Sequence, residues 1–302
     1  MIKWVRAYNL EHPDDKVSFV GFDMQSHYLP LDSLFTFLER QEPTLADSVE
    51  IWLEDLKQNG HNQFMVSIET KLAWFEQAQK SYEALLAKKM EWLKAAKTIT
   101  DSFQIKWGIQ YANLVKQFAE NAFKGHLSFY RDEAMAENIS WILSMHPPGT
   151  KMLVWAHDNH IARGDHPDND LNFYFGLSMG RHLSKKYGDK YKAFGLSTYE
   201  GDYWAQISYF DFRQQPCPLY PGPIGSLDEA LHQIALKKKS PALLLDLQEG
   251  RTQHWLSAPL PVRFANHVNI EYGYWTRYSI PYQFDGIFFV DKTSAAKSYA
   301  RK

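Results

Sequence analysis

The sequence predicts an α/β protein, with a parallel-rich mixed sheet flanked by helices and a long helical insertion. Short apolar runs typical of buried strands alternate with helical patterns in the last part of the chain. Residues 31–127 carry helical periodicity only. Apolar residues make up 45% of the 302 residues, enough for a sizeable core. We therefore assign residues 1–30 and 128–302 to an α/β core and residues 31–127 to a helical insertion subdomain.

The first part of the chain combines a helix end, a strand candidate and two long helices. Residues 1–9 resemble the last turns of a helix, and Val17–Phe22 forms an apolar strand candidate that ends at Asp23. Apolar residues then recur at steps of three, four or seven from Ile68 to Leu93 and from Trp107 to Phe118. This spacing predicts two long amphipathic helices packed as an antiparallel pair.

Residues 128–200 show an α/β pattern. Ser128 is a plausible N-cap for a helix that runs to about Met145. An apolar strand at Lys151–Ala156, a helix at about 172–187 and a strand at Ala193–Thr198 follow. Strand, helix and strand at this spacing form a βαβ unit, so we expect these two strands to be parallel.

The last hundred or so residues mix strands with one helix. Tyr203–Phe212 alternates as short strands do, and Ser226–Lys238 has a helical pattern. Ala242–Leu245 and Gly286–Val290 are two further apolar strands.

Composition excludes several classes of function. The net charge of -2 argues against nucleic acid as the main partner, because phosphate binding needs a basic surplus. No apolar run reaches the roughly 18 residues of a membrane span, so we predict no membrane partner. Cys217 is the single cysteine, which excludes an internal disulfide and a cysteine-based zinc site and favours a cytoplasmic location.

Polar, titratable residues follow four of the apolar strands. They are Asp23, the run His157-Asp-Asn-His160, Glu200 and Asp291. Ligands bind beyond the carboxyl ends of strands in open α/β sheets, so we expect a pocket there. His157 and His160 stand out, because imidazoles perform acid–base chemistry or bind metal. Loop histidines that only bond backbone groups are the alternative.

A metal ion is a weaker interpretation of these histidines. Asp165, His166 and Asp168 extend the run with further ligand types. However, His157 and His160 lie three residues apart, whereas a helical zinc pair lies four apart. We therefore predict no metal and no cofactor.

Arg131, Asp132 and Asn138 are further candidates on the helix after residue 128. Arg131 and Asn138 share a helical stripe with Met135 and Ile142, beside a buried face. A buried arginine needs an anionic partner. That partner is either a structural aspartate or a substrate oxyanion.

The sequence also holds a formal Gly-x-Ser-x-Gly pattern, Gly176-Leu-Ser178-Met-Gly180. In serine hydrolases this pattern forms the strand-to-helix turn that carries the nucleophile. Here a helical pattern already runs through it. We therefore expect Gly176 and Gly180 to be close-packing points on a helix against the sheet, with a nucleophilic Ser178 as the alternative.

Six blocks in this order resemble the erythromycin esterase family, which includes macrolide-inactivating esterases linked to antibiotic resistance and relatives labelled succinoglycan biosynthesis proteins. They are Trp4-x-Arg6-x-Tyr8-Asn9, Val20-Gly-Phe-Asp23-Met24-Gln25, Tyr130-Arg131-Asp132-x-x-Met135-Ala-x-Asn138, Val154-Trp-Ala-His157-Asp-Asn-His160, Met179-Gly180-Arg-His-Leu and Tyr199-Glu200-Gly201. The resemblance covers nearly the whole chain, and the third and fourth blocks are its specific parts.

The resemblance implies an α/β core with a helical insertion and a small-molecule ester or lactone substrate. It implies hydrolysis by a water molecule that His and Glu residues activate, rather than by a serine. On this basis we assign His157 and His160 as catalytic and Arg131, Asp132, Asp23, Asn138 and Glu200 as substrate-binding.

One departure from the family pattern matters for activity. The family carries an N-terminal strand and a Gly-Glu-x-x-His-Gly block that supplies the proposed general base, and this sequence has no such block. We therefore expect a chain that lacks the first βα segments, has little activity alone and leaves a sheet edge or core face exposed. The alternatives are a hydrolase that uses Ser178 or a metal at His157 and His160, and a non-catalytic binding protein.

Overall fold

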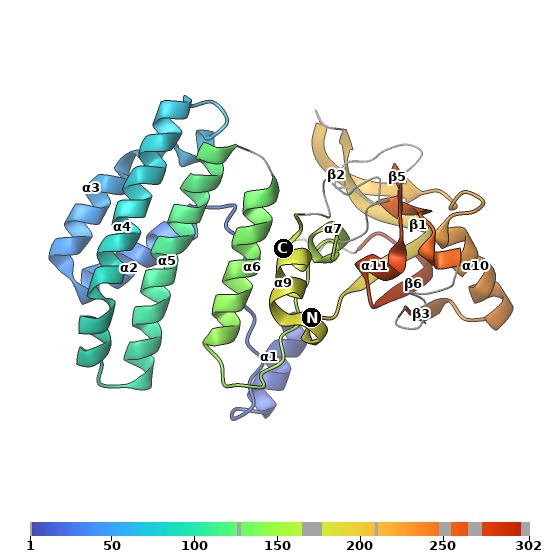
Figure 1. Cartoon of the computed structure of the whole chain (residues 1–302), viewed down its shortest axis with the longest axis horizontal. Helices are drawn as coiled ribbons and strands as arrows, with labels where there is room; N and C mark the ends of the chain where they lie inside the picture. The colour runs from blue at the N-terminus through green and yellow to red at the C-terminus, as the bar shows by residue number, and fades with distance from the viewer. Residues whose placement is uncertain are drawn as a thin grey trace. The chain divides into compact units, whose positions relative to one another are not determined.

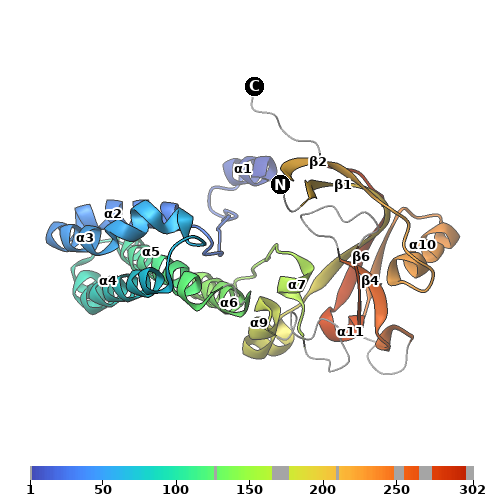
Figure 2. The same cartoon turned by 90° about the horizontal axis from the view of Figure 1, so that it is seen from above.

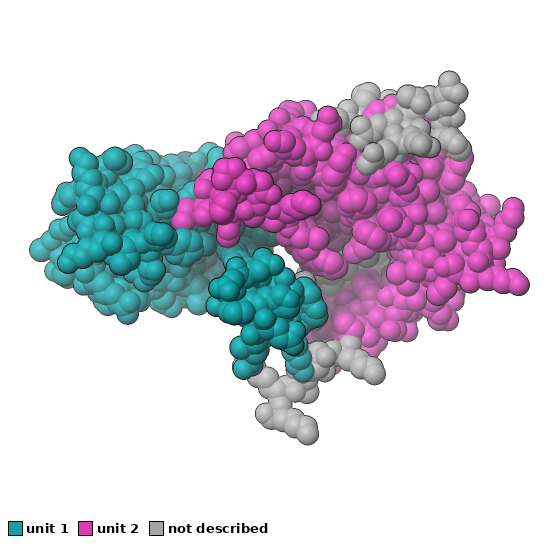
Figure 3. Space-filling model, turned by 90° about the horizontal axis from the view of Figure 1, so that it is seen from below, with its two compact units in different colours: residues 1–127, 137–142 teal, residues 128–136, 143–302 magenta. Residues whose placement is uncertain are grey.

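The computed structural model describes residues 2–125, 128–164, 177–208, 211–247, 255–264 and 274–296. The chain divides into two compact units, coloured separately in Figure 3. We call residues 1–127 with 137–142 the helical unit, and residues 128–136 with 143–302 the sheet unit. Residues 1–30 thus group with the helices, whereas the sequence analysis assigned them to the α/β core.

The helical unit contains the long helices that the sequence pattern predicts. Its elements are α1 (Ile2–Glu11), α2 (Tyr28–Gln41), α3 (Pro43–Asn59), a 3₁₀ turn (Gly60–Asn62), α4 (Ile68–Ala95), α5 (Ile99–Lys124) and part of α6 (Ser128–Ser144). The predicted pair of amphipathic helices is confirmed as α4 and α5, which pack against each other (Figure 1). A capping box between Thr98 and Asp101 starts α5 and fixes the tight turn after α4.

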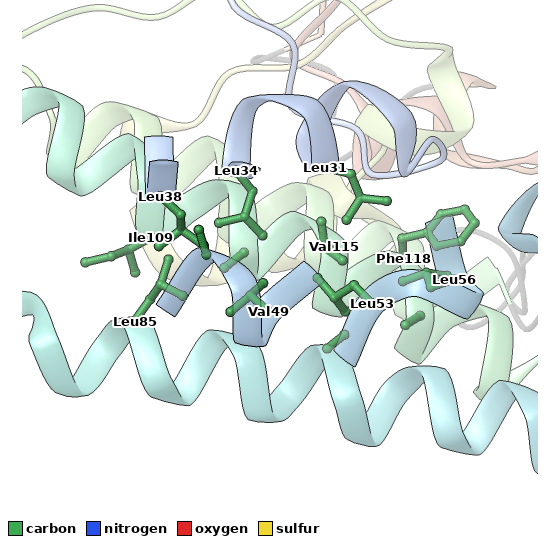
Figure 4. Close-up of a cluster of buried hydrophobic side chains, with 14 of the residues drawn as sticks. Leu31, Leu34, Leu38, Val49, Leu53, Leu56, Leu85, Ile109, Val115 and Phe118 are labelled. Carbon is green, nitrogen blue, oxygen red and sulfur yellow. The ribbon is translucent and has the colours of Figure 1, made fainter. Parts of the chain in front are cut away.

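Buried apolar residues of α2, α3, α4 and α5 form the core of the helical unit. Leu34 and Leu38 of α2, Val49 and Leu53 of α3 and Leu85 of α4 are fully buried. Figure 4 shows these side chains interleaved with Ile109, Val115 and Phe118 of α5. The apolar face of each amphipathic helix therefore meets another such face within the unit.

The strand predicted at Val17–Phe22 is wrong. The structure assigns no strand to these residues, and Phe19 is 65% exposed. A short apolar run becomes a strand only when a neighbouring strand pairs with its backbone. No such neighbour pairs with these residues in the part of the chain that the structure describes.

The described residues of the sheet unit form two sheets and several short helices. Its elements are part of α6, α7 (Asp158–Ile161), α9 (Met179–Tyr187), a 3₁₀ turn (Gly188–Lys190), β1 (Phe194–Ser208), β2 (Asp211–Leu219), α10 (Leu227–Lys238), β3 (Ala242–Asp246), a 3₁₀ turn (Trp255–Ser257), β4 (Leu260–Phe264), β5 (Tyr274–Tyr278), α11 (Ile280–Gln283) and β6 (Gly286–Thr293). The larger sheet has the strand order β2-β1-β6-β3 (Figures 1 and 2), and β4 pairs with β5 in a two-stranded sheet. β1 and β6 run parallel, and the other pairs are antiparallel.

These elements confirm the mixed α/β class with flanking helices. The predicted strands at Ala193–Thr198, Ala242–Leu245 and Gly286–Val290 are confirmed within β1, β3 and β6. The predicted helix at Ser226–Lys238 is α10, with the Ser226 side chain as its N-cap. Among the described residues, none of the helices combines the length and the apolar character that a lipid bilayer span requires.

The strand predicted at Lys151–Ala156 is wrong, and the βαβ unit built on it is wrong with it. These residues belong to no strand, and Leu153 and Trp155 are 84% and 71% exposed. The parallel neighbour of β1 is instead β6, some ninety residues further along the chain. The run is apolar as predicted, but none of the described strands pairs with it.

One face of the larger sheet carries the core of the sheet unit. Ile287 and Phe289 of β6 are buried against Leu231 of α10 and against Ile280 and Phe284 at α11. Figure 2 shows α10 alongside the sheet. This core anchors the loop that carries the candidate site, because Ile161 and Ala162 pack against the same cluster.

Candidate functional site

The two predicted catalytic histidines lie at the ends of α7, a single helical turn. His157 is the N-cap of this turn, and its Nδ1 lies 3.3 Å from the backbone N–H of Asn159 and 2.7 Å from Asn159 Oδ1. Its ring is exposed. His157 thus combines a local capping role with access to solvent.

His160 is held by a buried carboxylate. Its Nδ1 lies 2.8 Å from Oδ1 of Asp132, which comes from α6 and is only 5% exposed. Because a carboxylate accepts hydrogen bonds, this contact places the ring proton on Nδ1 and leaves the Nε2 lone pair available. The His160 side chain is 19% exposed, so its ring is partly accessible to solvent.

Asp132 also fixes the start of α9. The same Oδ1 atom accepts a hydrogen bond of 2.8 Å from the backbone N–H of Met179, the first residue of that helix. A negative charge is favoured at a helix N-terminus, where N–H groups lack partners within the helix. One buried carboxylate therefore joins α6, α7 and α9 at the candidate site.

Ser178 caps α9 and is not placed as a nucleophile. Its hydroxyl donates a 2.6 Å hydrogen bond to the carbonyl of Ala162 and accepts one from the backbone N–H of Arg181. The side chain is 1% exposed. The hydroxyl proton is thus committed to a carbonyl rather than to a histidine, unlike that of an activated serine. Gly176 lies outside the described residues.

Gly180 has the close-packing role that the sequence predicts, although its partner is α7 and not the sheet. A Cβ atom at this position would lie 2.2 Å from the carbonyl oxygen of Ile161. Only glycine allows the backbone of α9 to approach the end of α7 so closely.

Asp158 is a site residue that the sequence analysis quoted but did not assign. Its Oδ2 accepts a 3.0 Å hydrogen bond from the backbone N–H of Leu196 near the start of β1. Burial raises the pKa of Asp158 from 3.8 to about 6, while the Leu196 N–H and His157 act in the opposite direction. A Cβ at Gly195 would lie 3.3 Å from this oxygen, so glycine leaves room for the carboxyl group. In the sequence, the dense run of polar residues from His157 to His160 was the feature that could have identified Asp158 as a site residue.

A second polar network holds the chain that follows α7. The carboxylate of Asp285 is 3% exposed; it pairs with Arg163 and accepts a 2.8 Å hydrogen bond from the backbone of Ala193. The hydroxyl of Tyr191 donates to the carbonyl of Ile161 at 2.6 Å. These contacts anchor the segment next to His160 to the sheet core, which limits the movement of the histidine ring.

The other predicted site residues lie on several elements. Arg131 is half-buried on α6, one residue before Asp132. Asp23 is exposed in the helical unit, where it accepts a hydrogen bond from the N–H of Met24. Glu200 on β1 pairs with Lys292 of β6 at 3.1 Å.

Asn138 is a structural residue of the helical unit. It is 2% exposed and accepts a 2.9 Å hydrogen bond from Gln110. Its amide nitrogen donates to Gln117 at 2.9 Å and to the carbonyl of Phe22 at 3.0 Å. These contacts occupy both the amide oxygen and the amide nitrogen of the side chain. The predicted substrate-binding role of Asn138 stays a prediction.

The described residues contain no group of three or more His, Cys, Asp or Glu side chains arranged for a metal ion. The acidic and histidine residues that extend the motif, Asp165, His166 and Asp168, lie outside the described residues. A cavity of about 740 Å³ opens in the helical unit beside Phe37, Trp92 and Trp107, and none of the predicted site residues lines it.

Known structures share the fold of this chain. A succinoglycan biosynthesis protein of known structure is 20% identical and superimposes with a TM-score of 0.79 over 97% of this chain and 69% of its own. A Bacillus cereus protein is 22% identical, with a TM-score of 0.79 over 97% and 71%. A mutant of the erythromycin esterase EreC in its open conformation is 13% identical, with a TM-score of 0.62 over 96% and 72%.

Sequence comparison extends this likeness to the curated protein YbfO of Bacillus subtilis (strain 168), whose name describes it provisionally as a hydrolase. It is 24% identical over 167 residues, which are 54% of this chain and 34% of YbfO. The chain thus spans about a third of that relative. The family model described as erythromycin esterase matches residues 1–293, and the chain therefore belongs to the erythromycin esterase family.

Proposed function

We propose that this chain carries a histidine-based hydrolase site that cleaves a lactone or another carboxylic ester. The hydrogen-bonded pair of His160 and buried Asp132 is the observation that carries this proposal. An imidazole oriented by a carboxylate, with a free Nε2 lone pair, is a standard general base. Family membership supports a hydrolase-like function, and the ester specificity is our inference.

The proposed reaction uses water and needs no covalent intermediate. His160 Nε2 accepts a proton from a water molecule as its oxygen bonds to the ester carbonyl carbon. The tetrahedral intermediate then expels the alcohol oxygen, which takes a proton from the imidazolium. Exposed His157 is the second imidazole that can donate to the developing oxyanion. Ester and water thereby yield acid and alcohol, with both histidines returned to their starting state.

The buried position of Ser178 supports the water mechanism over a serine nucleophile. The proposed substrates include macrolide lactones and sugar esters, because both present the same carbonyl chemistry. Cytoplasm is the proposed compartment, since the single cysteine, Cys217, is unpaired and buried.

The test is the hydrolysis of a macrolide lactone, a simple γ-lactone and a p-nitrophenyl ester by the whole chain and its variants. We expect the wild-type chain to hydrolyse at least one of these substrates. His160→Gln should lower kcat by about 100-fold or more, and Asp132→Asn by about 10- to 100-fold.

His232→Gln is the matched control. His232 pairs with Asp291 at 2.6 Å and has the same 19% side-chain exposure as His160, but it lies on α10. Turnover that survives His160→Gln and is lost in Ser178→Ala would assign the serine mechanism. Turnover abolished by a chelator would assign a metal. Tight ligand binding without turnover would make the chain a binding protein, and each of these results would overturn the proposal.

A further inference from the structure

The cavity in the helical unit has a lining of its own, which includes none of the predicted site residues. It lies between α2, the end of α4 and the first part of α5 (Figure 1), so all its walls belong to one compact unit. Its volume of about 740 Å³ falls within the roughly 300–1,000 Å³ that is usual for small-molecule sites. The cavity can therefore hold a ligand with more than one ring.

The walls of the cavity are rich in aromatic rings. Phe37 of α2 meets Trp92 of α4 edge-on, with ring centroids 5.6 Å apart. The ring centroid of Trp107 on α5 lies 6.1 Å from that of Phe103 and 5.7 Å from that of Tyr111. All five rings line the cavity. Flat apolar molecules pack well against such ring faces and edges, so the walls suit an aromatic ligand.

A glycine in the middle of α5 makes room for one of these walls. A Cβ atom at Gly108 would lie 2.3 Å from the Phe37 ring. Glycine is a poor helix former, so its presence inside a long helix costs stability. Here it allows the Phe37 ring to lie directly against the backbone of α5, which fixes the ring as a wall of the cavity.

The indole N–H of Trp107 is buried and has no hydrogen-bond acceptor in the part of the chain that the structure describes. Two other indoles of the helical unit meet carboxylates. Trp74 Nε1 donates to Asp55 at 2.5 Å, and Trp92 Nε1 donates to Glu42 at 3.4 Å. A buried donor without an acceptor is unfavourable. Because Trp107 lines the cavity, a bound oxygen toward which the indole turns would supply the missing acceptor.

The directions of α2 and α5 determine which residues meet at each end of the cavity. His27, at the start of α2, lies against Phe118 in the second half of α5, with ring centroids 4.7 Å apart. Phe37, later in α2, lies against Gly108, which is earlier in α5. The two helices are therefore antiparallel, and the end of α2 lies beside the beginning of α5.

This end of the cavity carries two cations. Arg40 of α2 and Lys97, between α4 and α5, line it, and neither forms an ion pair with another described residue. Asp101 is at the same end, but its carboxylate accepts hydrogen bonds of 3.0 and 2.9 Å from the backbone N–H groups of Lys97 and Thr98. Asp32, the other acid in the lining, precedes Arg40 by about two helical turns. Unpaired positive charge therefore gathers at one end of an aromatic cavity.

We propose that this cavity binds an aromatic carboxylate. The rings of the ligand pack against Phe37 and Trp92. Its carboxylate pairs with Arg40 and Lys97 and accepts a hydrogen bond from Trp107 Nε1. Charge-assisted hydrogen bonds to an arginine are among the strongest in proteins, and they select an acid over a neutral molecule of the same shape. The inference does not depend on the proposed hydrolase site.

The test is isothermal titration calorimetry of the whole chain with three probes of similar shape. Naphthylacetate, naphthylacetamide and naphthylethylamine carry a negative, a neutral and a positive group on the same ring system. We expect naphthylacetate to bind about tenfold more tightly than naphthylacetamide, because only the acid forms charge-assisted hydrogen bonds with both cations. Naphthylethylamine should bind most weakly, because its charge has the same sign as that of the cations.

Two variants locate the binding site. Arg40→Gln with Lys97→Gln should reduce the preference for the acid over the amide to less than about twofold. Both side chains are exposed, so the variant should keep its fold. Trp107→Phe keeps an aromatic ring but removes the N–H, and it should weaken naphthylacetate binding by about three- to tenfold. Circular dichroism checks that each variant is folded.

Lys106→Gln is the matched control. Lys106 is an exposed cation of α5, but it does not line the cavity. This substitution removes one positive charge from the same helix, so it should leave the affinities of all three probes unchanged. A fall in naphthylacetate affinity in Lys106→Gln as large as in the double variant would show that only the net charge of the chain matters, and it would overturn the proposal.

Four further results would also overturn the proposal. No measurable binding of naphthylacetate would remove the assigned ligand class. Equal binding of the acid and the amide would remove the recognition of charge. Tighter binding of the amine would assign the cavity to a cation held by aromatic rings. Naphthylacetate binding that is unchanged in both variants would place its site elsewhere on the chain.

Discussion

The helical unit and the sheet unit differ in how completely they bury their own apolar side chains. Leu34, Leu53 and Leu85 of the helical unit are fully buried. In the sheet unit, Leu196 and Leu244 lie within regular strands and remain more than half exposed. Apolar residues recur regularly in the sequences of both units. The difference in burial therefore depends on which other elements pack against each helix or strand.

The difference shows that the two units depend on chain contacts of different range. Helices of the helical unit find their partners nearby in sequence, as in the α4–α5 hairpin. The larger sheet also needs pairing between distant segments: β1 pairs with the adjacent β2 but also with β6, about ninety residues later. A unit built on strands is therefore more easily left with an uncovered face.

The largest expected difference is in the free energy of unfolding lost when a leucine is replaced by alanine in each unit. Leu53→Ala should lower the free energy of unfolding by about 2–5 kcal/mol, because it leaves a cavity in a closed core. Leu196→Ala should change it by less than about 1 kcal/mol, because the side chain already contacts solvent. Urea denaturation followed by circular dichroism measures both values. Equal losses would contradict the difference in burial.

The next effect concerns the buried acid at the candidate site in the sheet unit. The pKa of Asp158 is raised from 3.8 to about 6 in the folded chain. The folded state therefore binds this proton more tightly, and its contribution to stability is present below pH 4 and is lost as pH rises through about 6. Asp158→Asn should remove this dependence and stabilise the chain at pH 7.5 by about 1–3 kcal/mol.

Thermal unfolding of the wild type and the variant at pH 4 and pH 7.5 tests this expectation. Titratable groups that both proteins share affect both unfolding temperatures equally, so their effects cancel when the two proteins are compared at one pH. Asp189→Asn is the control, because it removes an exposed carboxyl group in the same unit. If Asp158→Asn stabilises the chain equally at pH 4 and at pH 7.5, Asp158 does not titrate in this range.

The smallest effect concerns the surface of the same sheet. Glu200 and Lys292 form an ion pair of 3.1 Å with side chains 37% and 71% exposed. Glu200→Gln should lower the free energy of unfolding by less than about 0.5 kcal/mol, because solvent screens the pair. Glu200 was also predicted to bind substrate. A large fall in ester turnover without loss of stability would support that role, and unchanged turnover would remove it.

Local patterns predicted the helices well because the information lies within each segment. The spacing from Ile68 to Leu93 predicted α4, and Ser226 correctly marked the start of α10. The strands predicted at Val17–Phe22 and Lys151–Ala156 are absent, because a strand also needs a distant partner that the local pattern does not contain.

The candidate site was partly predictable for the same reason. The dense run of His157 and His160 was visible in the sequence, and the family resemblance pointed to Asp132. The hydrogen bond between His160 and Asp132 joins residues 28 positions apart, so no local pattern could reveal it. Asn138 lies on the same helix as Asp132 but bonds within the helical unit, and helical spacing alone did not separate these two roles.

The dual attachment of Asp132 has a consequence for how relatives should be interpreted. The oxygen that orients His160 also accepts the first N–H of α9, so losing Asp132 would damage the fold whether or not the chain catalyses anything. A descendant that abandoned chemistry would still be selected to keep the aspartate. An aspartate at this position in a distant homologue is therefore evidence for the same fold and not for catalysis. Catalysis has to be inferred from the groups that face Nε2 of the histidine.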